Sequence, residues 1–326
     1  MNTAMKVGII GAGHIGGKIA RTLAATEGVD CLAVASRSIG KAGDFAAEFN
    51  VPRAYGSYGE LLDDPDVDLV YVATPHSHHF DVTMEALRKG KPCLVEKAFM
   101  ANAAQTKAVL GLSRERKVFV GEAIWTRYQP AVGMIRKLLE DGRIGSMKMI
   151  SATLAYSIAD RPRVVRPELC GGALLDLGVY AINFIRMVCP NPIEKIDSQC
   201  ILSESGVDFS ETVSMVLEGG IMASFQSSAC CAGYNTATIA GSEGYIVIDN
   251  VNNPHVIQVY TLGGILREEL TVPERITGYE YEFLACRDAI GKGLIEPEEM
   301  PHSETLFIME LMDTLRKEWG VRYPMD

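Results

Sequence analysis

The sequence predicts an α/β protein with two domains: an N-terminal doubly wound parallel sheet and a C-terminal α+β domain built on a large, mostly antiparallel open sheet. A glycine-rich turn follows the first apolar run, strand and helix patterns alternate through residue 123, and short strand-like runs crowd together in the second half. The length of 326 residues also favours two cores over one. We therefore expect domains at 1–123 and 124–326.

The first glycine-rich turn predicts a strand, a tight turn and a helix over residues 6–21, KVGIIGAGHIGGKIAR. Gly11 permits the turn, Gly13 lets the main chain approach a pyrophosphate, and Gly16 lets the helix pack on the strand. The N–H groups at the start of a helix also bind phosphate. This is the pattern of a Rossmann-type dinucleotide-binding domain, although an ordinary glycine-rich turn is the alternative. The predicted cofactor-binding residues here are Gly11, Gly13, His14, Ile15 and Gly16.

A second strand is predicted at 29–35, and it ends in Ser36-Arg37-Ser38. An Asp or Glu at this place bonds the ribose 2′-hydroxyl of NAD, whereas an arginine fork suits the 2′-phosphate of NADP. We therefore predict NADP as the cofactor, bound by Ser36, Arg37 and Ser38, with NAD as the alternative. The competing interpretation of Arg37 is an arginine merely exposed at a strand end.

Strand and helix patterns continue to alternate as far as residue 123. Helices are predicted at 41–49, 81–89 and 102–116, and a capping box at Ser57 and Glu60 predicts the start of a further helix. Strands are predicted at 68–73, 93–95 and 118–120. Helices of about ten residues between strands imply parallel crossovers, and ligands then lie at the carboxyl ends of the strands. The residues predicted to complete the cofactor site from these ends are Thr74, Pro75, His76, His79, Glu96, Lys97, Glu122, Trp125 and Arg127.

Composition excludes several classes of protein. The net charge of −10 argues against a nucleic-acid surface, because no basic excess is present to displace counterions. No apolar run approaches the roughly 20 residues that a membrane helix needs, and the few residues before the first strand are too short for a signal peptide. We therefore expect a cytoplasmic protein with a small-molecule substrate and no nucleic-acid or membrane partner.

A metal site is not expected. The eight cysteines include no C-x-x-C pair and several lie in apolar segments, which favours buried thiols. The run His76-Ser77-His78-His79 has the composition of a metal cluster, but it opens a helix beside the predicted dinucleotide site.

The second half predicts a sheet with one helix-covered face. Helices are predicted at 130–141, 173–188, 279–291 and 303–319, with strands at 147–156, 193–203, 210–218, 221–229, 236–240, 244–250, 255–260 and 266–271. Few helices separate these strands, so the sheet is mostly antiparallel, and helices are available for only one of its faces. The other face is free for a second copy. We expect a homodimer or a higher oligomer through this sheet.

Three polar residues, Asp176, Tyr180 and Asn183, share one face of the apolar helix 173–188. The functional interpretation is that they line a cleft opposite Glu96 and Lys97. An ammonium group beside a tyrosine favours the tyrosinate and lets the hydroxyl shuttle a proton. The structural interpretation is that local N–H groups cap Asp176 and the Tyr180 hydroxyl reaches solvent.

The chain resembles the glucose-fructose oxidoreductase / inositol dehydrogenase (Gfo/Idh/MocA) family over essentially its full length. The motifs that carry the resemblance are Gly11–Gly16, Ala73-Thr74-Pro75-His76 with His79, Glu96-Lys97 and Gly171–Tyr180. The segment Glu122–Tyr128 and Tyr180 are most similar to the branch that holds dimeric dihydrodiol dehydrogenase and NADP-dependent D-xylose dehydrogenase.

The resemblance implies Lys97 and an acid/base at Tyr180 beside the nicotinamide, with Asp176 orienting the substrate. It implies an NAD(P)-dependent oxidoreductase acting on a sugar or a cyclic diol. Ala98 stands where the family often has proline, and Tyr180 stands where many members have histidine, which disfavours inositol-type substrates. Two alternatives stay open: a glycosidase or isomerase that recycles a tightly bound dinucleotide, and a non-catalytic dinucleotide-sensing protein.

Replacing Arg37 by alanine should narrow the preference for NADP over NAD. A charge-assisted pair with the 2′-phosphate contributes roughly 1.5–3 kcal/mol, and NAD has no phosphate to lose. The measurement is the ratio of kcat/KM for the two cofactors in both proteins. An unchanged ratio would show that Arg37 does not bind the 2′-phosphate.

Overall fold

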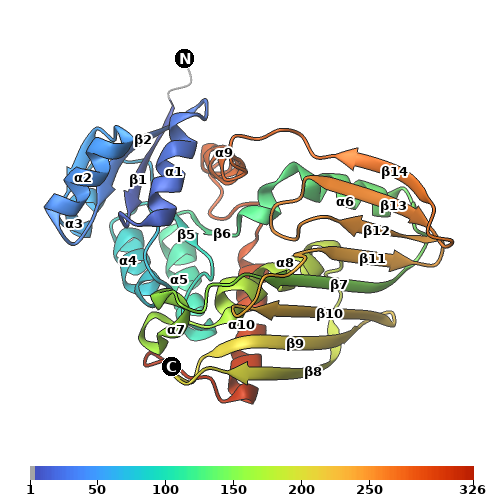
Figure 1. Ribbon diagram of the computed structural model, residues 1–326. Helices are drawn as coiled ribbons and strands as arrows, with labels where there is room; N and C mark the ends of the chain where they lie inside the picture. Colours follow the sequence, from blue (N-terminus) through green and yellow to red (C-terminus); the bar gives the residue numbers. More distant parts are fainter. Residues whose placement is uncertain (1–3) are drawn as a thin grey trace. The chain divides into compact units, whose positions relative to one another are not determined.

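The computed structural model describes residues 4–326 and divides into two compact units (Figure 1). The first unit contains the described residues up to Trp125 together with Arg275–Glu310 and Met325–Asp326. The second contains Thr126–Glu274 and Leu311–Pro324. The expected division into two consecutive segments at 123/124 therefore differs from the units found here, because the chain returns to the first unit near its end.

Packing explains why Arg275–Glu310 belongs to the first unit. Phe283, on helix α9 (Glu280–Gly291), is buried with its ring centroid 5.3 Å from that of Tyr71. Val120 N also donates to Ile295 O at 3.0 Å. These contacts join residues far apart in the sequence, which an alternation pattern does not reveal.

The first unit contains a six-stranded parallel sheet in the order β3-β2-β1-β4-β5-β6, which confirms the doubly wound prediction. Its strands are β1 (Met5–Ile10), β2 (Val29–Ala35), β3 (Arg53–Tyr55), β4 (Leu69–Val72), β5 (Cys93–Glu96) and β6 (Val120–Ala123). Its main helices besides α9 are α1 (His14–Ala24), α2 (Ile39–Phe49), α3 (Tyr58–Leu62), α4 (His76–Arg88) and α5 (Ala103–Arg116). Ser57 and Asn102 cap α3 and α5 through Glu60 N and Gln105 N, as expected.

Two strands differ from the sequence pattern. The polar edge strand β3 has no apolar alternation, so the pattern does not reveal it. The strand expected at 118–120 begins instead at Val120 and runs through Glu122, because Cys93 pairs with Val120 and Val95 pairs with Glu122. A carboxylate in a buried strand runs against the apolar pattern on which the prediction depended.

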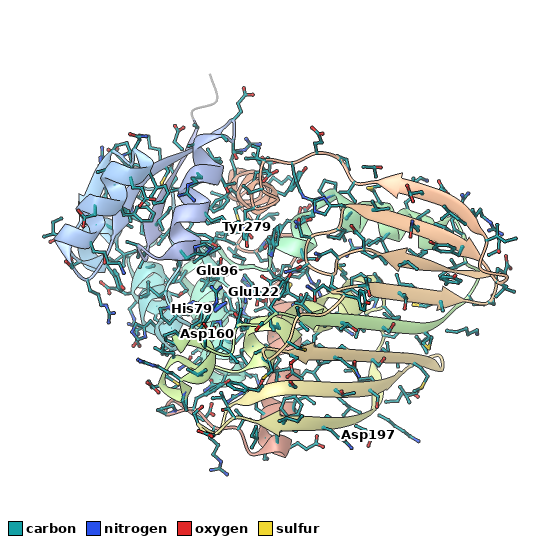
Figure 2. The ribbon with its side chains drawn as sticks, in the orientation of Figure 1. His79, Glu96, Glu122, Asp160, Asp197 and Tyr279 are labelled. Atoms are coloured by element: carbon teal, nitrogen blue, oxygen red, sulfur yellow. The ribbon has the colours of Figure 1, made fainter. Side chains whose placement is uncertain are left out.

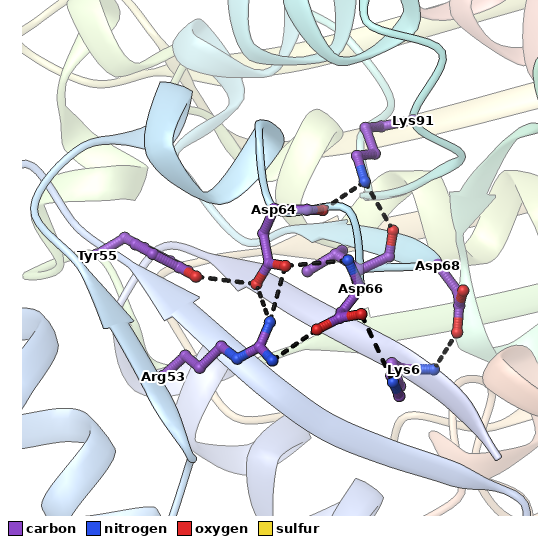
Figure 3. A network of polar contacts seen from close by, with 8 residues as sticks. Lys6, Arg53, Tyr55, Asp64, Asp66, Asp68 and Lys91 are labelled. Atoms are coloured by element: carbon purple, nitrogen blue, oxygen red, sulfur yellow. Dashed lines mark hydrogen bonds and ion pairs between the residues drawn. The ribbon is translucent and has the colours of Figure 1, made fainter.

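A polar network joins β3 to the loop before β4 (Figure 3). The Arg53 guanidinium donates to both carboxylate oxygens of Asp64 at 2.8 and 2.7 Å and to Asp66 at 2.6 Å. Tyr55 donates to Asp64 at 2.9 Å. Burial opposes ionisation of Asp64, but these donors hold its pKa below the usual value. The network thus fastens the short edge strand that backbone pairing alone would hold weakly.

The second unit contains an eight-stranded sheet in the order β14-β13-β12-β11-β7-β10-β9-β8. All pairs are antiparallel except β7 with β10, which confirms a mostly antiparallel sheet. The strands are β7 (Met147–Ala155), β8 (Ile193–Leu202), β9 (Asp208–Leu217), β10 (Ile221–Ser228), β11 (Ala237–Gly241), β12 (Gly244–Ile248), β13 (Val256–Thr261) and β14 (Leu266–Thr271). The main helices are α6 (Pro130–Glu140), the short α7 (Pro162–Val165), α8 (Val179–Val188) and the C-terminal part of α10 (His302–Trp319).

Helix α8 packs on β7 and β10 and buries one face of this sheet. Ile150 and Phe225 point to that face and are buried, whereas Met149 and Met222 on the same two strands are 50% and 49% exposed. The alternation along each strand thus separates a covered face from an open one.

The predicted helix 173–188 begins as a single π-helical turn, Leu174–Gly178, and continues as α8. The segment Pro167–Val188 is long and apolar enough to cross a membrane by composition: an 18-residue window of it has a mean hydropathy of 1.4, but 89% of that window is buried inside the protein. It is therefore the core helix of the second unit.

His79 braces the loop after β5 from within the first unit (Figure 2). Its buried ring has Nε2 2.8 Å from Thr74 O and Nδ1 3.1 Å from both Ala98 O and Phe99 O. Both nitrogens thus contact main-chain oxygens, which is a supporting role not expected from the sequence. Burial, with a smaller contribution from the charge of His76, lowers the pKa of His79 to about 3.

Replacing His79 by glutamine should flatten the pH dependence of stability on the acid side. The folded state keeps this imidazole neutral down to about pH 3, whereas the unfolded chain protonates it near its usual pKa of about 6.5. Between these values the unfolded state binds the extra proton, so His79 makes the free energy of unfolding fall with falling pH by up to ~1.4 kcal/mol per unit. Urea unfolding at pH 5, 6 and 7 measures the slope.

The matched control is His78→Gln, because the His78 ring is only partly buried and contacts the Ser77 hydroxyl. Equal slopes in the wild type and in the His79 variant would contradict the assignment of a neutral, buried imidazole.

Candidate active site

The glycine-rich turn of the first unit leaves room for a ligand at one position and none at two others. A Cβ added at Gly11, where φ is +118°, would lie 2.6 Å from Ala73 O, and one at Gly16 would overlap Gly11 O. A Cβ at Gly13 would meet no atom within 4 Å. Gly13 is also the N-cap of α1 and has no side chain to accept from the first-turn N–H groups. The turn therefore offers those donors, with His14 exposed and Ile15 half-buried beside them.

At the end of β2, the three predicted phosphate-binding residues have different surroundings. Ser36 is buried and Arg37 is exposed. Among the described residues, the Arg37 guanidinium makes no hydrogen bond or ion pair, so it is available to a ligand. Ser38 instead caps α2, with its Oγ accepting from Lys41 N at 3.5 Å. Its hydroxyl already has a structural role.

Thr74, His76, Glu96 and Lys97 follow the neighbouring strands β4 and β5. His76 Nε2 is 3.1 Å from Lys97 O, and Glu96 accepts a short hydrogen bond from Tyr71. The Lys97–Ala98 peptide is cis. Thr74 Oγ1 is buried without a hydrogen-bond partner in the described part of the chain. Thr74 directly follows Ala73, whose main chain lies against Gly11 of the glycine-rich turn. A buried hydroxyl without a partner at this place can bond a polar group of a bound cofactor.

An aromatic stack follows β6. The rings of Trp125 and Tyr279 are parallel with centroids 4.2 Å apart, and Lys18 Nζ lies 4.9 Å from the Tyr279 centroid. Lys18 is on α1, one turn after His14. Tyr279 belongs to Arg275–Glu310, which is far from the glycine-rich turn in the sequence, so the sequence alone did not reveal it. Lys18 could have been found, because a residue four positions after His14 lies on the same face of the helix.

The loop that carries Tyr279 is fixed by Glu280. Its carboxylate accepts from the main-chain N–H groups of Ile276, Thr277 and Gly278 at 2.8, 3.1 and 2.7 Å. Thr277 Oγ1 is also 2.8 Å from Thr22 Oγ1 on α1. The loop is therefore held against the helix that follows the glycine turn.

These residues fit a dinucleotide. The open position at Gly13 and the first turn of α1 suit the pyrophosphate, the available Arg37 suits a 2′-phosphate, and the Thr74 hydroxyl suits a ribose or nicotinamide group. Glu122 is buried within β6, and Pro75 is the N-cap of α4. Contacts of these two residues with a cofactor stay predictions.

In the second unit, Asp176 lies in the π-helical turn and is buried. Arg163 Nη2 approaches Asp176 Oδ2 at 3.0 Å, and the two side chains are 47% and 8% exposed. Tyr180, in the first turn of α8, is also buried. Arg163 was not among the predicted site residues, because its loop has no regular pattern and the ion pair depends on the fold.

Asn183 and Arg127 pair with each other in the second unit. Arg127 Nε donates to Asn183 Oδ1 at 2.6 Å, and Asn183 Nδ2 donates to Val179 O at 2.8 Å. Both side chains are buried. Asn183 therefore has a structural role, and the contact of Arg127 with the cofactor stays a prediction.

Within residues 4–326, no group of three or more His, Cys, Asp and Glu side chains is arranged to hold a metal ion. The cysteines are free thiols, and Cys230 and Cys231 are exposed. The organisation of the site thus comes from glycine main chain, hydroxyls, carboxylates and arginines.

Comparison with known proteins agrees with this organisation. Residues 5–123 match the model of the oxidoreductase family with an NAD-binding Rossmann fold, and residues 132–247 match the GFO/IDH/MocA C-terminal domain. The chain is 34% identical over 339 residues to mouse trans-1,2-dihydrobenzene-1,2-diol dehydrogenase, covering 99% of each chain.

Two solved structures have the same fold. A 3-ketoreductase from Actinomadura kijaniata in complex with NADP and TDP-benzene has a TM-score of 0.88 at 24% identity, covering 98% of this chain and 99% of that one. The aldose-aldose oxidoreductase from Caulobacter crescentus, complexed with glycerol, has a TM-score of 0.88 at 21% identity, covering 97% and 98%. With both halves matched and a near full-length relative above 30% identity, the chain belongs to the Gfo/Idh/MocA family of NAD-binding oxidoreductases.

Proposed function

We propose that this protein is an NADP-dependent dehydrogenase that interconverts a hydroxyl and a carbonyl group on a sugar or a cyclic diol. The observation that carries the proposal is the pair Asp176 and Tyr180, two buried polar side chains one turn apart on a largely apolar helix. Buried polar groups need a purpose, and a carboxylate with a phenol suits hydroxyl recognition and proton transfer. The names of the mouse relative and of the aldose oxidoreductase support this substrate class.

The preference for NADP rests on Arg37. Its guanidinium is exposed at the end of β2, where an acidic residue would serve NAD. The 3-ketoreductase of the same fold was solved with NADP, which is consistent with this choice.

The proposed mechanism divides the work between the cofactor and three side chains. The main chain at Gly13 and the Arg37 guanidinium would hold NADP, which would supply hydride transfer to and from the substrate carbon. Tyr180, as the tyrosinate, takes the hydroxyl proton as the C–O bond becomes a carbonyl, and in reduction it returns that proton. Lys97 stabilises the tyrosinate, and Asp176 accepts a hydrogen bond from a substrate hydroxyl. The Arg163 ion pair favours the carboxylate form of Asp176.

Three substitutions test these roles. Tyr180→Phe should lower kcat by ~10²–10⁴ with NADP affinity near wild type, because the acid/base is lost and the cofactor contacts are kept. Lys97→Met should be at least as severe. Asp176→Asn should be milder and should act more on KM. Steady-state kinetics, with a substrate found from a panel of aldoses, polyols and cyclic diols, measures all three.

Stoichiometric NADPH formation in this panel separates a dehydrogenase from an enzyme that recycles a bound dinucleotide. Turnover like the wild type in both Tyr180→Phe and Lys97→Met would move the proton transfer elsewhere, with His76 the next candidate.

We further propose a homodimer formed through the open face of the large sheet. Paired positions on neighbouring strands line up Met222, Met149, Ala240, Tyr245 and Tyr260 across this face. The two tyrosine rings stack with centroids 4.8 Å apart. Such an apolar row suits a self-complementary interface. The apolar residues Val213, Met215 and Leu217 of β9 lie buried on the covered face, so they take no part in this row.

Light scattering at micromolar concentration should give at least twice the chain mass of 35.5 kDa. Met222→Glu should shift the protein towards the monomer, because it would bury a charge in the interface. The control is Ile39→Glu, which places the same charge at an exposed apolar residue of the first unit. A wild-type monomer would refute the proposed interface.

A further inference from the structure

Two buried carboxyl groups, Asp208 and Glu211, lie on strand β9 beneath the π-helical turn of the second unit. Leu202 pairs with Asp208 and Ile201 pairs with Ser210, so β9 carries one extra residue at this point. Because of this bulge, residues three apart point to the same covered face of the sheet. Both side chains are almost inaccessible to solvent.

Asp208 caps the segment that leads into the catalytic helix. Its Oδ2 accepts from Leu174 N at 2.5 Å, and its Oδ1 is buried without a hydrogen-bond partner among the described residues. A Cβ at Gly172, where φ is +125°, would overlap Asp208 Oδ1. A carboxylate at the N-terminal N–H groups of a helix satisfies donors that have no partner within the helix. The carboxylate thus requires glycine at 172 and fixes the main chain two residues before Asp176.

Glu211 supports the other end of the same turn. A Cβ at Gly178 would lie 2.9 Å from Glu211 Oε1 and 3.1 Å from Ser227 Oγ, and Ser227 donates to Glu211 through a short hydrogen bond. Gly178 is the last residue of the π-helical turn, two residues before Tyr180. The π-helical turn that contains Asp176 therefore packs against one carboxyl group at each of its ends.

Other groups facing this pair come from α10 and the residues after it. Arg316 is buried, lies 4.3 Å from the Tyr323 ring centroid and bonds Asp313 at 2.7 Å. Tyr323 donates to Gly171 O at 2.6 Å. Cys200 on β8 also faces both carboxyl groups. Arg316 is thus a cation that favours the ionised form of Asp208, and Cys200 and Glu211 lie on the same covered face.

The surroundings give the two carboxyl groups different protonation states. Burial raises the pKa of Asp208 to about 6, although its N–H donors and Arg316 oppose this. Burial, and then the negative charge of Asp208, raises the pKa of Glu211 well above its usual value. The Leu174 N–H and Arg316 thus favour the ionised form of Asp208, whereas burial and the charge of Asp208 favour the protonated form of Glu211.

We propose that Asp208 is a positioning residue for the reaction: its carboxylate holds the main chain at Gly172–Leu174 and thereby sets the placement of Asp176 and Tyr180. The inference rests on the proposed function of those two side chains. Protonation removes the negative charge of this acceptor and so weakens its hydrogen bond to the Leu174 N–H. Activity should therefore fall as the pH drops through about 6, with the ionised form of Asp208 the competent one.

The test compares two isosteric variants, Asp208→Asn and Glu211→Gln. Asparagine is uncharged and offers Leu174 N a weaker acceptor than the carboxylate, so kcat should fall on the order of 10–100-fold while NADP affinity, measured by fluorescence titration, stays unchanged. The acid limb of the kcat profile should also disappear, because no group titrates at that position. Glutamine copies the protonated Glu211, so this variant should keep a near-wild-type kcat and the acid limb near pH 6.

A second measurement needs neither the variant nor a substrate. Hydrogen exchange of wild-type protein, corrected for the intrinsic rate at each pH, should show protection of the Leu174 N–H that falls below about pH 6. Protection that does not change between pH 5 and 7 would overturn the inference even if Asp208→Asn fails to fold.

The outcomes separate the inference from the proposed function. If Asp208→Asn folds and matches Glu211→Gln in kcat and in its pH profile, the positioning role is wrong while the dehydrogenase assignment stands. If no substrate of the panel is oxidised or reduced, the proposed function fails, and hydrogen exchange still decides whether Asp208 fixes the turn.

Discussion

The close contact between Gly11 and the main chain of Ala73 is the constraint on which the ligand-facing edge of the first unit depends. Gly11 N donates to Ala35 O at 3.0 Å, and Ala73 N donates to Ile10 O at 2.8 Å. The glycine turn is therefore joined to the ends of both neighbouring strands, with no space for a side chain between them. Arg37 and Thr74 follow those two strand ends, so their spacing from the turn is set by sheet pairing rather than by flexible loops.

Both units bury carboxyl groups beside the elements expected to do chemistry. In the first unit, Glu282 is fully buried without a hydrogen-bond partner among the described residues, and burial followed by the charges of Glu96 and Glu280 raises its pKa well above the usual value. In the second unit, Asp208 and Glu211 repeat the pattern. Burying a carboxyl group costs stability unless hydrogen bonds compensate, so these acids do not strengthen the cores in the way that apolar side chains do.

The sequence predicted the elements whose signal is local. The glycine turn, the caps at Ser57 and Asn102 and the alternating strands of the second half follow from neighbours a few residues apart. It did not predict features that depend on distant partners: the stack of Tyr279 on Trp125, or the ion pair of Arg163 with Asp176. The π-helical turn is likewise invisible to a periodicity of 3.6, because the carboxyl groups that seat it come from a strand thirty residues further on.

The stack of Trp125 on Tyr279 also has a spectroscopic consequence. The chain contains only two tryptophans, and the compact units hold one each: Trp125 in the first and Trp319 in the second, where its indole donates to Ser198 at 2.8 Å. The indole emission of the native protein is therefore the sum of two signals from separate cores. With either tryptophan replaced by phenylalanine, the remaining one reports the melting of a single unit, and the two halves of the molecule become separately observable without any added label.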